Sequence, residues 1–280
     1  MSFFESGTPK VQGSDLTKAL HGKKLYLLDM DGTLYLGNRL FPDALPFLEE
    51  VKKSGAEFMF LTNNSSRGSH DYVRKLTQMG IPCSPGDFFT STDAACAYLR
   101  ANFGEQLIYA LGTESFKQQL KNEGFRMTDQ LEDGIDLLLM GYDTELTYQK
   151  LVDAAILLGR GVTYLATNPD WVCPTEYGSV PDCGSIAQAL EHATGRMPRF
   201  LGKPEPDIAR LAMAKKGILP EETVLVGDRI YTDIACGKRA GVTSVLVFSG
   251  ETSLEMLKES DIQPDFAVEG IGDILKALRK

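Results

Sequence analysis

The chain has 280 residues, of which 43% are hydrophobic, and this length favours two folded domains over one. Its 38 acidic and 29 basic residues give a formal charge of -9 without a dense Lys/Arg cluster, so a nucleic-acid partner is not expected. Residues 1–20 lack the pattern of an export signal, and no apolar run approaches the roughly 20 residues of a membrane span. We therefore expect a soluble, cytoplasmic protein without a membrane partner.

The five cysteines form an odd set without C-x-x-C spacing, which favours reduced thiols over a disulfide framework or a zinc site. Cys173 and Cys183 lie in a loop-like stretch and could pair under oxidation, although idle thiols are the simpler interpretation. The histidines lie outside every motif, which argues against a histidine phosphatase mechanism.

After a polar, weakly patterned stretch at 2–15 that predicts a loose extension, short apolar runs alternate with helical patterns. This alternation indicates βα repetition, a largely parallel sheet and the α/β class. The spacing predicts helices that include Tyr148–Leu158 and Ile208–Lys216. The predicted strands are Leu25–Leu28, Glu57–Leu61, Leu107–Leu111, Asp136–Met140, Thr163–Ala166, Thr223–Val226 and Ser244–Phe248.

A block from about Ser91 to Met197 contains three of these strands and helices of its own, but few candidates for phosphate chemistry. We therefore predict an inserted domain at 91–197, which leaves 1–90 and 198–280 for the main domain. Within the main domain, predicted strands end one or two residues before Asp29, Thr62 and Asp228. Because ligands of open α/β sheets lie beyond the carboxyl ends of strands, these residues should share one site.

Asp29 and Asp31 are two residues apart in an extended segment, so their carboxylates project to the same side. Two neighbouring carboxylates are costly without a cation or a shared proton, and Mg²⁺ would account for the pair. Gly32 would let the backbone pass close to a bound phosphate. The simpler alternative is an Asp-Gly turn that closes a strand, with Asp31 capping the loop.

Thr62 and Asn63 begin a polar stretch at 62–66 whose hydroxyl, amide and backbone N–H groups could donate to phosphate oxygens, or cap a helix. Lys203 lies in a stretch that glycine and proline make stiff, which suits a charge that binds phosphate, although a lone lysine is usually solvated. A nucleotide P-loop is rejected because Pro204 stands where Ser or Thr should bind Mg²⁺.

Asp228 closes an apolar strand and is a candidate metal ligand, with Asp233 about one helical turn further on. Asp233 could support the metal ligands from the outer sphere, or be an acidic residue favoured in the first turn of a helix. The two roles of Asp233 are compatible.

These four elements, in this order, resemble the haloacid dehalogenase superfamily of aspartate-nucleophile phosphatases over about residues 24–280. The residues of these motifs are most similar to those of subclass IIA, the branch of p-nitrophenyl phosphatases and N-acetylglucosamine-operon phosphatases. The motifs are Asp29-Met30-Asp31-Gly32-Thr33-Leu34, Leu61-Thr62-Asn63-Asn64-Ser65, Gly202-Lys203-Pro204 and Gly227-Asp228-Arg229. This branch inserts an α/β cap between its second and third motifs, so the resemblance implies a Rossmann-like parallel-sheet core with a smaller inserted cap.

The resemblance implies a Mg²⁺-dependent phosphatase that moves a phosphoryl group onto Asp29 and then hydrolyses the aspartyl-phosphate. Asp31 would act as general acid and then base. The implied phosphate ligands are Thr62, Asn63 and Lys203. The cation would be held by the carboxylates of Asp29 and Asp228 and the backbone carbonyl of Asp31, with a phosphate oxygen and waters.

Cap loops should select the leaving group, and the loop at 168–174 is the best candidate. Trp171, the only tryptophan of the chain, could stack on a sugar, base or pyridine ring, or pack between cap and core. Asp170 could bind a leaving-group hydroxyl, or be an ordinary solvated turn residue. The expected substrates are small phosphomonoesters such as sugar phosphates or nucleoside monophosphates, with p-nitrophenyl phosphate as an in vitro substrate.

A phosphomutase of the same superfamily is the first alternative to a phosphatase. A receiver-like signalling module is disfavoured by the inserted block and by Asp31, and a silent phosphate-binding protein by the full set of catalytic residue types. The resemblance also leaves open a homodimer that forms through the cap.

Overall fold

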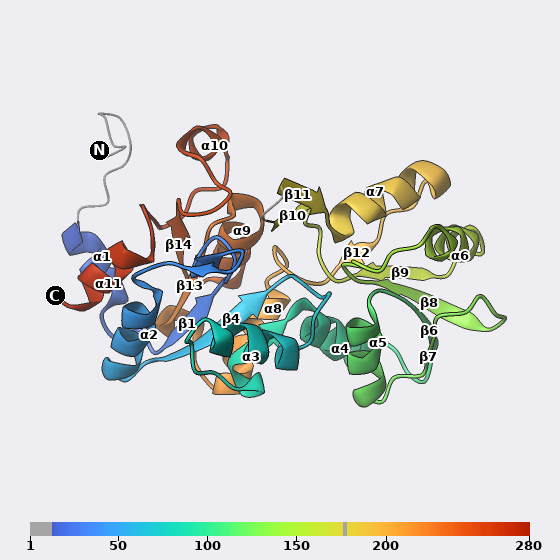
Figure 1. Cartoon of the computed structure of the whole chain (residues 1–280), viewed down its shortest axis with the longest axis horizontal. Helices are drawn as coiled ribbons and strands as arrows, with labels where there is room; N and C mark the ends of the chain where they lie inside the picture. Colours follow the sequence, from blue (N-terminus) through green and yellow to red (C-terminus); the bar gives the residue numbers. More distant parts are fainter. Residues whose placement is uncertain (1–12, 176–177) are drawn as a thin grey trace.

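A computed structural model describes residues 13–175 and 178–280. Figure 1 shows two bodies of sheet and helices at opposite ends of an elongated molecule. We call the body around the six-stranded sheet the large unit and the body around the five-stranded sheet the small unit. Both sheets are built from parallel pairs flanked by helices, which confirms the predicted α/β class.

The sheet of the large unit has the strand order β15-β14-β13-β1-β4-β5. Its strands are β1 (Leu25–Leu28), β4 (Glu57–Thr62), β5 (Phe88–Thr90), β13 (Thr223–Gly227), β14 (Thr243–Val247) and β15 (Phe266–Val268). Its helices are α1 (Gly13–Leu20), α2 (Ala44–Lys53), α3 (Ser69–Gln78), α8 (Asp207–Lys216), α9 (Ala235–Ala240), α10 (Leu254–Glu259) and α11 (Ile271–Leu278), with a π-helical turn at Ile230–Ile234 and 3-10 turns at Pro85–Asp87 and Pro220–Glu222. A short antiparallel hairpin, β2 (Tyr35–Leu36) and β3 (Arg39–Leu40), follows β1.

The sheet of the small unit has the order β12-β9-β8-β6-β7. Its strands are β6 (Leu107–Leu111), β7 (Met127–Thr128), β8 (Ile135–Met140), β9 (Thr163–Ala166) and β12 (Arg199–Phe200). Its helices are α4 (Ser91–Asn102), α5 (Glu114–Asn122), α6 (Tyr148–Gly159) and α7 (Cys183–Thr194). Between β9 and α7 the chain forms an antiparallel hairpin of β10 (Val172–Thr175) and β11 (Gly178–Pro181).

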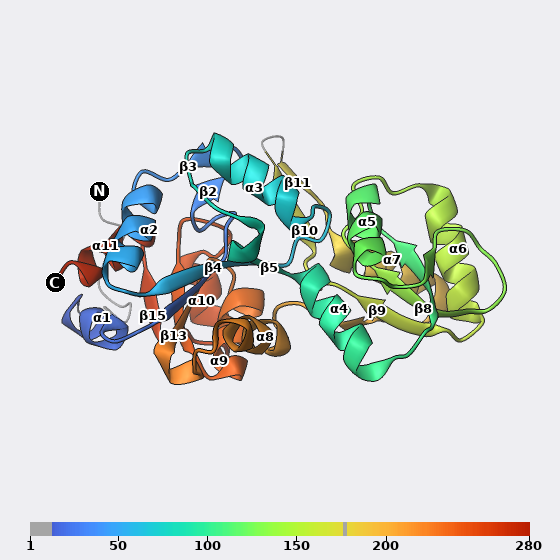
Figure 2. The ribbon, with the colours of Figure 1, turned by 90° about the horizontal axis from the view of Figure 1, so that it is seen from below.

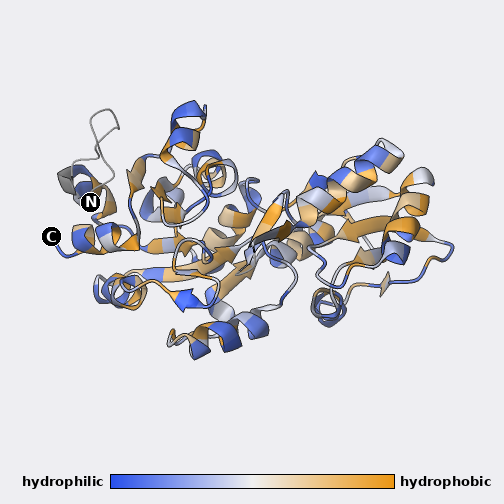
Figure 3. Cartoon of the chain, turned by 45° about the horizontal axis from the view of Figure 1, so that its top comes forward, coloured by the Kyte–Doolittle hydropathy of each residue, from blue (hydrophilic) through white to orange (hydrophobic). Residues whose placement is uncertain are grey.

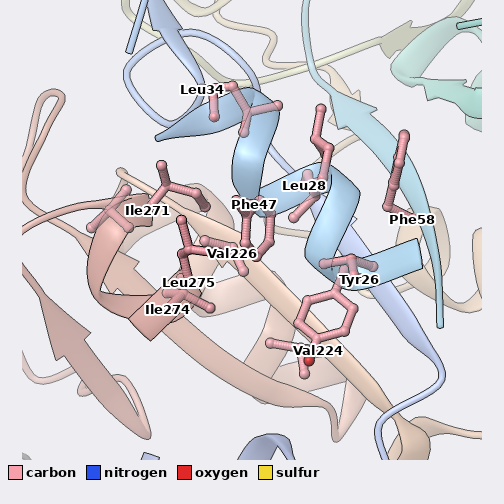
Figure 4. Close-up of a cluster of buried hydrophobic side chains, with 14 of the residues drawn as sticks. Tyr26, Leu28, Leu34, Phe47, Phe58, Val224, Val226, Ile271, Ile274 and Leu275 are labelled. Carbon is pink, nitrogen blue, oxygen red and sulfur yellow. The ribbon is translucent and has the colours of Figure 1, made fainter. Parts of the chain in front are cut away.

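Both faces of the large sheet are covered, which explains why its strands read as unbroken apolar runs. Tyr26 and Leu28 of β1 pack toward α2 and α11, where Phe47 and Ile274 meet them (Figure 4). Alternate residues of the same strand, such as Leu25, lie in a separate cluster with α8 and α9 on the opposite face. Figure 3 shows the apolar residues gathered on the strands, with polar residues on the outer helix faces.

The central strands have nearly the predicted bounds. Those of β1, β6 and β9 agree, those of β4, β8 and β13 differ by one residue at one end, and β14 is shifted by one residue at both ends. The sheet strands that were not predicted are the edge strands β5, β7, β12 and β15. An edge strand of two or three residues is too short to carry an apolar run or an alternation, so no sequence pattern predicts it.

The predicted division into 1–90 with 198–280 and 91–197 stays a prediction. Strand β12 pairs with β9 in the small unit, although it lies just beyond residue 197. At the other boundary, α4 begins directly after β5 and runs toward the small unit (Figure 2).

Most of the predicted loose extension at 2–15 lies outside the described residues. Its last residues, 13–15, begin helix α1, so they are not a loose segment. Within the described ranges, no helix is both long and apolar enough to cross a membrane.

Candidate active site

A cavity of about 530 Å³ lies at the carboxyl ends of β1 and β4. Residues from both units line it. The structure brings together in its wall Asp29, Asp31, Thr62, Asn63, Asp170 and Lys203. Asp233 also lines the cavity, whereas Gly32, Trp171 and Asp228 do not lie in its wall.

Lys203 is the central cation of the site. Its Nζ atom lies 2.7 Å from Asp29 Oδ1 and 2.6 Å from Asp233 Oδ1, and it donates to the Leu61 carbonyl oxygen at 3.0 Å. Burial alone would lower the pKa of this lysine, but the two carboxylates raise it above its usual value. Lys203 is therefore a buried, charged group and not a solvated surface lysine.

Asn63 fixes the backbone of Lys203 in two directions. The Asn63 side chain donates from Nδ2 to the Lys203 carbonyl oxygen and accepts at Oδ1 from the Lys203 N–H, both at 2.8 Å. A Cβ atom on Gly202 would lie 2.6 Å from Asn63 Oδ1, so glycine is needed for this close packing. These contacts make Asn63 a support for Lys203, in addition to its predicted place in the cavity wall.

Asp29, Asp228 and Asp233 form a cluster in which one carboxylate oxygen of each lies within 4.8 Å of the others. Burial raises the pKa of Asp29 to about 7 against the opposing effect of Lys203. Burial and the nearby Asp29 raise the pKa of Asp228 as well. One lysine thus leaves this cluster with excess negative charge in a poorly solvated place.

The donor set of this cluster fits a divalent cation of the Mg²⁺ type, which prefers carboxylate oxygens. Asp228 Oδ2 accepts from the Glu251 N–H at 2.7 Å, whereas Asp228 Oδ1 is buried and, among the described residues, has no hydrogen-bond partner. Both oxygens of Asp233 are occupied, one by Lys203 and one by the Arg229 N–H at 3.0 Å. This difference supports Asp228 as the ligand and Asp233 as the outer support.

Gly32 lies against Asp228 and not in the cavity wall. Its φ of 84° is the left-handed conformation that favours glycine, and a Cβ atom there would lie 2.5 Å from Asp228 Oδ2. Its N–H donates to the Tyr35 carbonyl oxygen at 2.7 Å within the turn that leads to β2. The structure therefore gives a second reason for glycine at this position, its close approach to the Asp228 carboxylate, and the close approach to phosphate stays a prediction.

Asp31 lies in the cavity wall beside Asp29, and the Gly37 N–H donates a weak hydrogen bond to its Oδ1 at 3.4 Å. Burial raises the pKa of Asp31, and the Lys75 charge opposes this shift. A carboxyl group with a raised pKa retains a proton more readily at neutral pH, as a general acid must.

Asp170 and Trp171, adjacent in the chain, take different positions. Asp170 is buried in the cavity wall, with its Oδ1 atom 3.3 Å from Arg229 Nη1. Trp171 is 51% exposed, and its carbonyl oxygen accepts from the Ser185 hydroxyl at 2.6 Å near the start of α7. Asp170, Cys173 and Pro174 of this loop line the cavity, whereas the half-exposed Trp171 side chain does not. Stacking of Trp171 on a substrate ring stays a prediction.

The cavity also contains residues to which sequence reasoning assigned no role, namely Arg67, Lys75, Tyr142, Asp182 and Arg229. Arg229 directly follows Asp228, and this adjacency was the one available signal. The others come from helices and loops without a local motif. All five cysteines are free thiols, Cys173 and Cys183 included.

The chain is similar to proteins of a known family. A model described as haloacid dehalogenase-like hydrolase matches residues 26–126, and a second, HAD-hydrolase-like model matches residues 200–274. An acid sugar phosphatase from Staphylococcus haemolyticus is 32% identical over 257 residues, which cover 92% of this chain and 97% of that protein.

Two solved structures are similar along most of the chain. A 4-nitrophenylphosphatase from Thermotoga maritima is 41% identical, with a TM-score of 0.87 over 93% of this chain and 99% of that one. A glycerol phosphate phosphatase from Mycobacterium tuberculosis, solved in complex with magnesium, is 27% identical, with a TM-score of 0.85 over 91% of this chain and 77% of that one. Each of these relatives acts on a phosphate ester, as its name states.

Proposed function

The chain belongs to the haloacid dehalogenase-like hydrolases and is a phosphoric monoester hydrolase, and on this premise we propose that it uses Mg²⁺ and an aspartyl-phosphate on Asp29. The observation that carries the proposal is the position of Asp29. Its carboxylate lies in the cavity wall, paired with buried Lys203 and clustered with Asp228. A carboxylate so placed can attack a phosphorus atom while neighbouring charges hold the phosphate.

In the first step, an Asp29 oxygen forms a bond to phosphorus as the ester P–O bond breaks. The leaving oxygen takes the proton of Asp31, whose raised pKa suits this donation. In the second step, ionised Asp31 accepts a proton from water, the water oxygen bonds to phosphorus, and the bond to Asp29 breaks. The products are free phosphate and an alcohol, and both carboxyl groups return to their starting states.

Mg²⁺, when bound by Asp29, Asp228 and the Asp31 backbone carbonyl, would supply positive charge that offsets the phosphate dianion. Lys203 supplies a second positive charge next to Asp29, with its backbone held by Asn63 and its ammonium group paired with Asp233. Uncatalysed hydrolysis of phosphate monoesters is so slow that several preorganised charges are required, and this cluster provides them.

The cavity wall carries polar groups of both signs beyond the reacting centre. Arg67 and Lys75 come from the large unit, and Asp170 and Asp182 from the small unit. Such a wall suits a leaving group with polar substituents, so we include sugar phosphates and nucleoside monophosphates in the proposal, with p-nitrophenyl phosphate as an in vitro substrate. A cap function for the small unit, a cytoplasmic location and a homodimer through the small unit remain further proposals.

Phosphate release from a panel of metabolite phosphates and p-nitrophenyl phosphate tests the proposal, with Mg²⁺, with EDTA, and with the variant Asp29→Asn. We expect metal-dependent release that Asp29→Asn abolishes. Asp133→Asn is the matched control, because its side chain is fully exposed, and it should behave as the wild type. Release that resists EDTA, or an active Asp29→Asn enzyme, would overturn the assignment. Isomerised substrate without free phosphate would indicate a phosphomutase.

A further inference from the structure

Arg229 joins the two units beside the cavity. Its guanidinium Nη1 lies 3.3 Å from Asp170 Oδ1, and its Nη2 donates to the Val172 carbonyl oxygen at 3.4 Å. Both partners belong to the segment from the end of β9 into β10, so one side chain of the large unit holds a loop of the small unit.

The ion pair between Arg229 and Asp170 is largely shielded from water. Their side chains are 14% and 5% exposed, so salt screens this pair less than it screens a surface pair. Asp170 Oδ2 accepts a hydrogen bond from Asn168 Nδ2 at 3.0 Å, which leaves Oδ1 facing Arg229. Loss of either partner would leave a buried charge without its counterion.

Arg229 also connects the loops that hold the clustered carboxylates. Its Nε lies 2.9 Å from Glu251 Oε2, and the N–H of Glu251 donates to Asp228 Oδ2 at 2.7 Å. The backbone N–H of Arg229 itself donates to Asp233 Oδ2 at 3.0 Å. A displacement of Arg229 therefore reaches Asp233 through one hydrogen bond. It reaches Asp228 through Glu251, by an ion pair and then a hydrogen bond.

We propose that Arg229 is a positioning residue that couples the loop of Asp170 to the carboxylate geometry around Asp228. Cation and phosphate binding should then favour the arrangement in which Arg229 and Asp170 are paired, and the pairing should in turn strengthen that binding, because such coupling is reciprocal. The inference rests on the proposed function in taking Asp228 as a cation ligand. It goes beyond that function by assigning Asp170 to a link between the units.

Trp171 provides a direct readout of this link. It is the only tryptophan in the chain, it follows Asp170 directly, and it is 51% exposed, so its fluorescence reports on the loop. The protein is titrated with Mg²⁺ in the presence of inorganic phosphate while the emission is recorded. The variants are Asp170→Asn, Arg229→Gln, Arg229→Lys and the double variant of Asp170→Asn with Arg229→Gln.

For the wild type we expect a saturable change of Trp171 emission. Asp170→Asn should raise the Mg²⁺ concentration at half the change about tenfold, a typical cost for losing a residue that supports metal ligands. Arg229→Gln should raise this Mg²⁺ concentration at least as much. The double variant should raise it no further than the single variant with the larger effect, because both substitutions break the same link. Arg229→Lys keeps the charge and should recover part of the response.

Arg279→Gln is the matched control, because it breaks an exposed ion pair with Glu50 on another face of the large unit. It should titrate as the wild type. The coupling would be overturned if Asp170→Asn and Arg229→Gln reached half the emission change at the same Mg²⁺ concentration as the wild type. Additive effects in the double variant would overturn it as well. So would a wild type that hydrolyses phosphate esters without any change of emission.

A thermal melt of each variant shows whether Arg229→Gln is folded. If Arg229→Gln is unfolded, the milder substitution Asp170→Asn tests the coupling. A wild type without Mg²⁺-dependent phosphate release would instead contradict the proposed function. Failure of the link and failure of the function are therefore distinguishable.

Discussion

The ammonium group of Lys203 lies 2.7 Å from the carboxylate of Asp29, although 174 positions separate the two residues in the chain. The same Nζ atom contacts Asp233 Oδ1 at 2.6 Å, so one buried cation serves the buried Asp233 and the partly buried Asp29. This relationship places the proposed nucleophile next to a fixed positive charge before any substrate binds.

Replacing Lys203 with methionine should therefore harm both catalysis and stability. The change keeps much of the side-chain volume but removes the charge, so we expect kcat to fall about 10²–10³-fold, as for loss of a preorganised donor. The free energy of unfolding should fall by about 3–5 kcal/mol, because the buried Asp233 and the partly buried Asp29 lose their counterion.

Steady-state kinetics and urea unfolding measure these two effects of Lys203→Met. The exposed Lys258→Met variant is the control and should change neither quantity appreciably. Wild-type kcat in Lys203→Met would show that this lysine has no part in the chemistry.

A methyl group at Gly250 should disturb Asp228 without removing any polar group. The added Cβ atom would lie 2.0 Å from Asp228 Oδ2, so the carboxylate or the loop must move. We expect the Mg²⁺ concentration for half-maximal activity to rise about tenfold. Gly104→Ala is the control, since its Cβ would meet no atom within 4 Å. Equal Mg²⁺ requirements in the two variants would argue against Asp228 as a ligand.

Asp182 should make the protein less stable as the pH rises. Burial, and then the charge of Asp170, raise its pKa to about 7. Between about pH 4 and pH 7, Asp182 is therefore protonated in the native state and ionised in the unfolded state. The free energy of unfolding falls as the pH rises through this range.

Asp182→Asn should remove this dependence while it retains an N-cap residue for α7. The free energy of unfolding of Asp182→Asn, relative to that of the wild type, should be higher at pH 8 than at pH 5 by about 1–3 kcal/mol, because the wild type must ionise a buried carboxyl group at the higher pH. Denaturant unfolding at the two pH values measures this difference. A difference that does not change with pH, as expected for the exposed Asp133→Asn, would contradict a buried ionisation at Asp182.

The fold class and the central strands could be predicted because buried parallel strands leave long apolar runs such as Leu25–Leu28. The carboxyl ends of these runs also indicated that Asp29 and Thr62 should be neighbours. Edge strands such as β12 could not be predicted, since two residues carry no periodicity. Partners supplied by distant elements, such as Asp170 for Arg229, leave no trace in local sequence.

Local sequence also did not reveal contacts that depend on close packing. Gly32 is expected at the phosphate, and the structure adds that its positive φ and its short distance to Asp228 require glycine there. Trp171 was expected to stack or to be buried, on the basis of its residue type, yet its loop turns Asp170 inward and leaves the indole exposed. Side-chain direction in a loop depends on backbone contacts with other elements, which pattern alone does not reveal.

Trapping of the phosphoenzyme is the most direct test of the account. In Asp31→Asn, p-nitrophenyl phosphate should still phosphorylate Asp29, because its leaving group needs little protonation, whereas hydrolysis lacks its general base. Mass spectrometry after an acid quench should then find one phosphoryl group on the peptide that contains Asp29. A phosphoryl group on another residue, or turnover by Asp31→Asn at the wild-type rate with no phosphorylated protein, would contradict the aspartyl-phosphate mechanism.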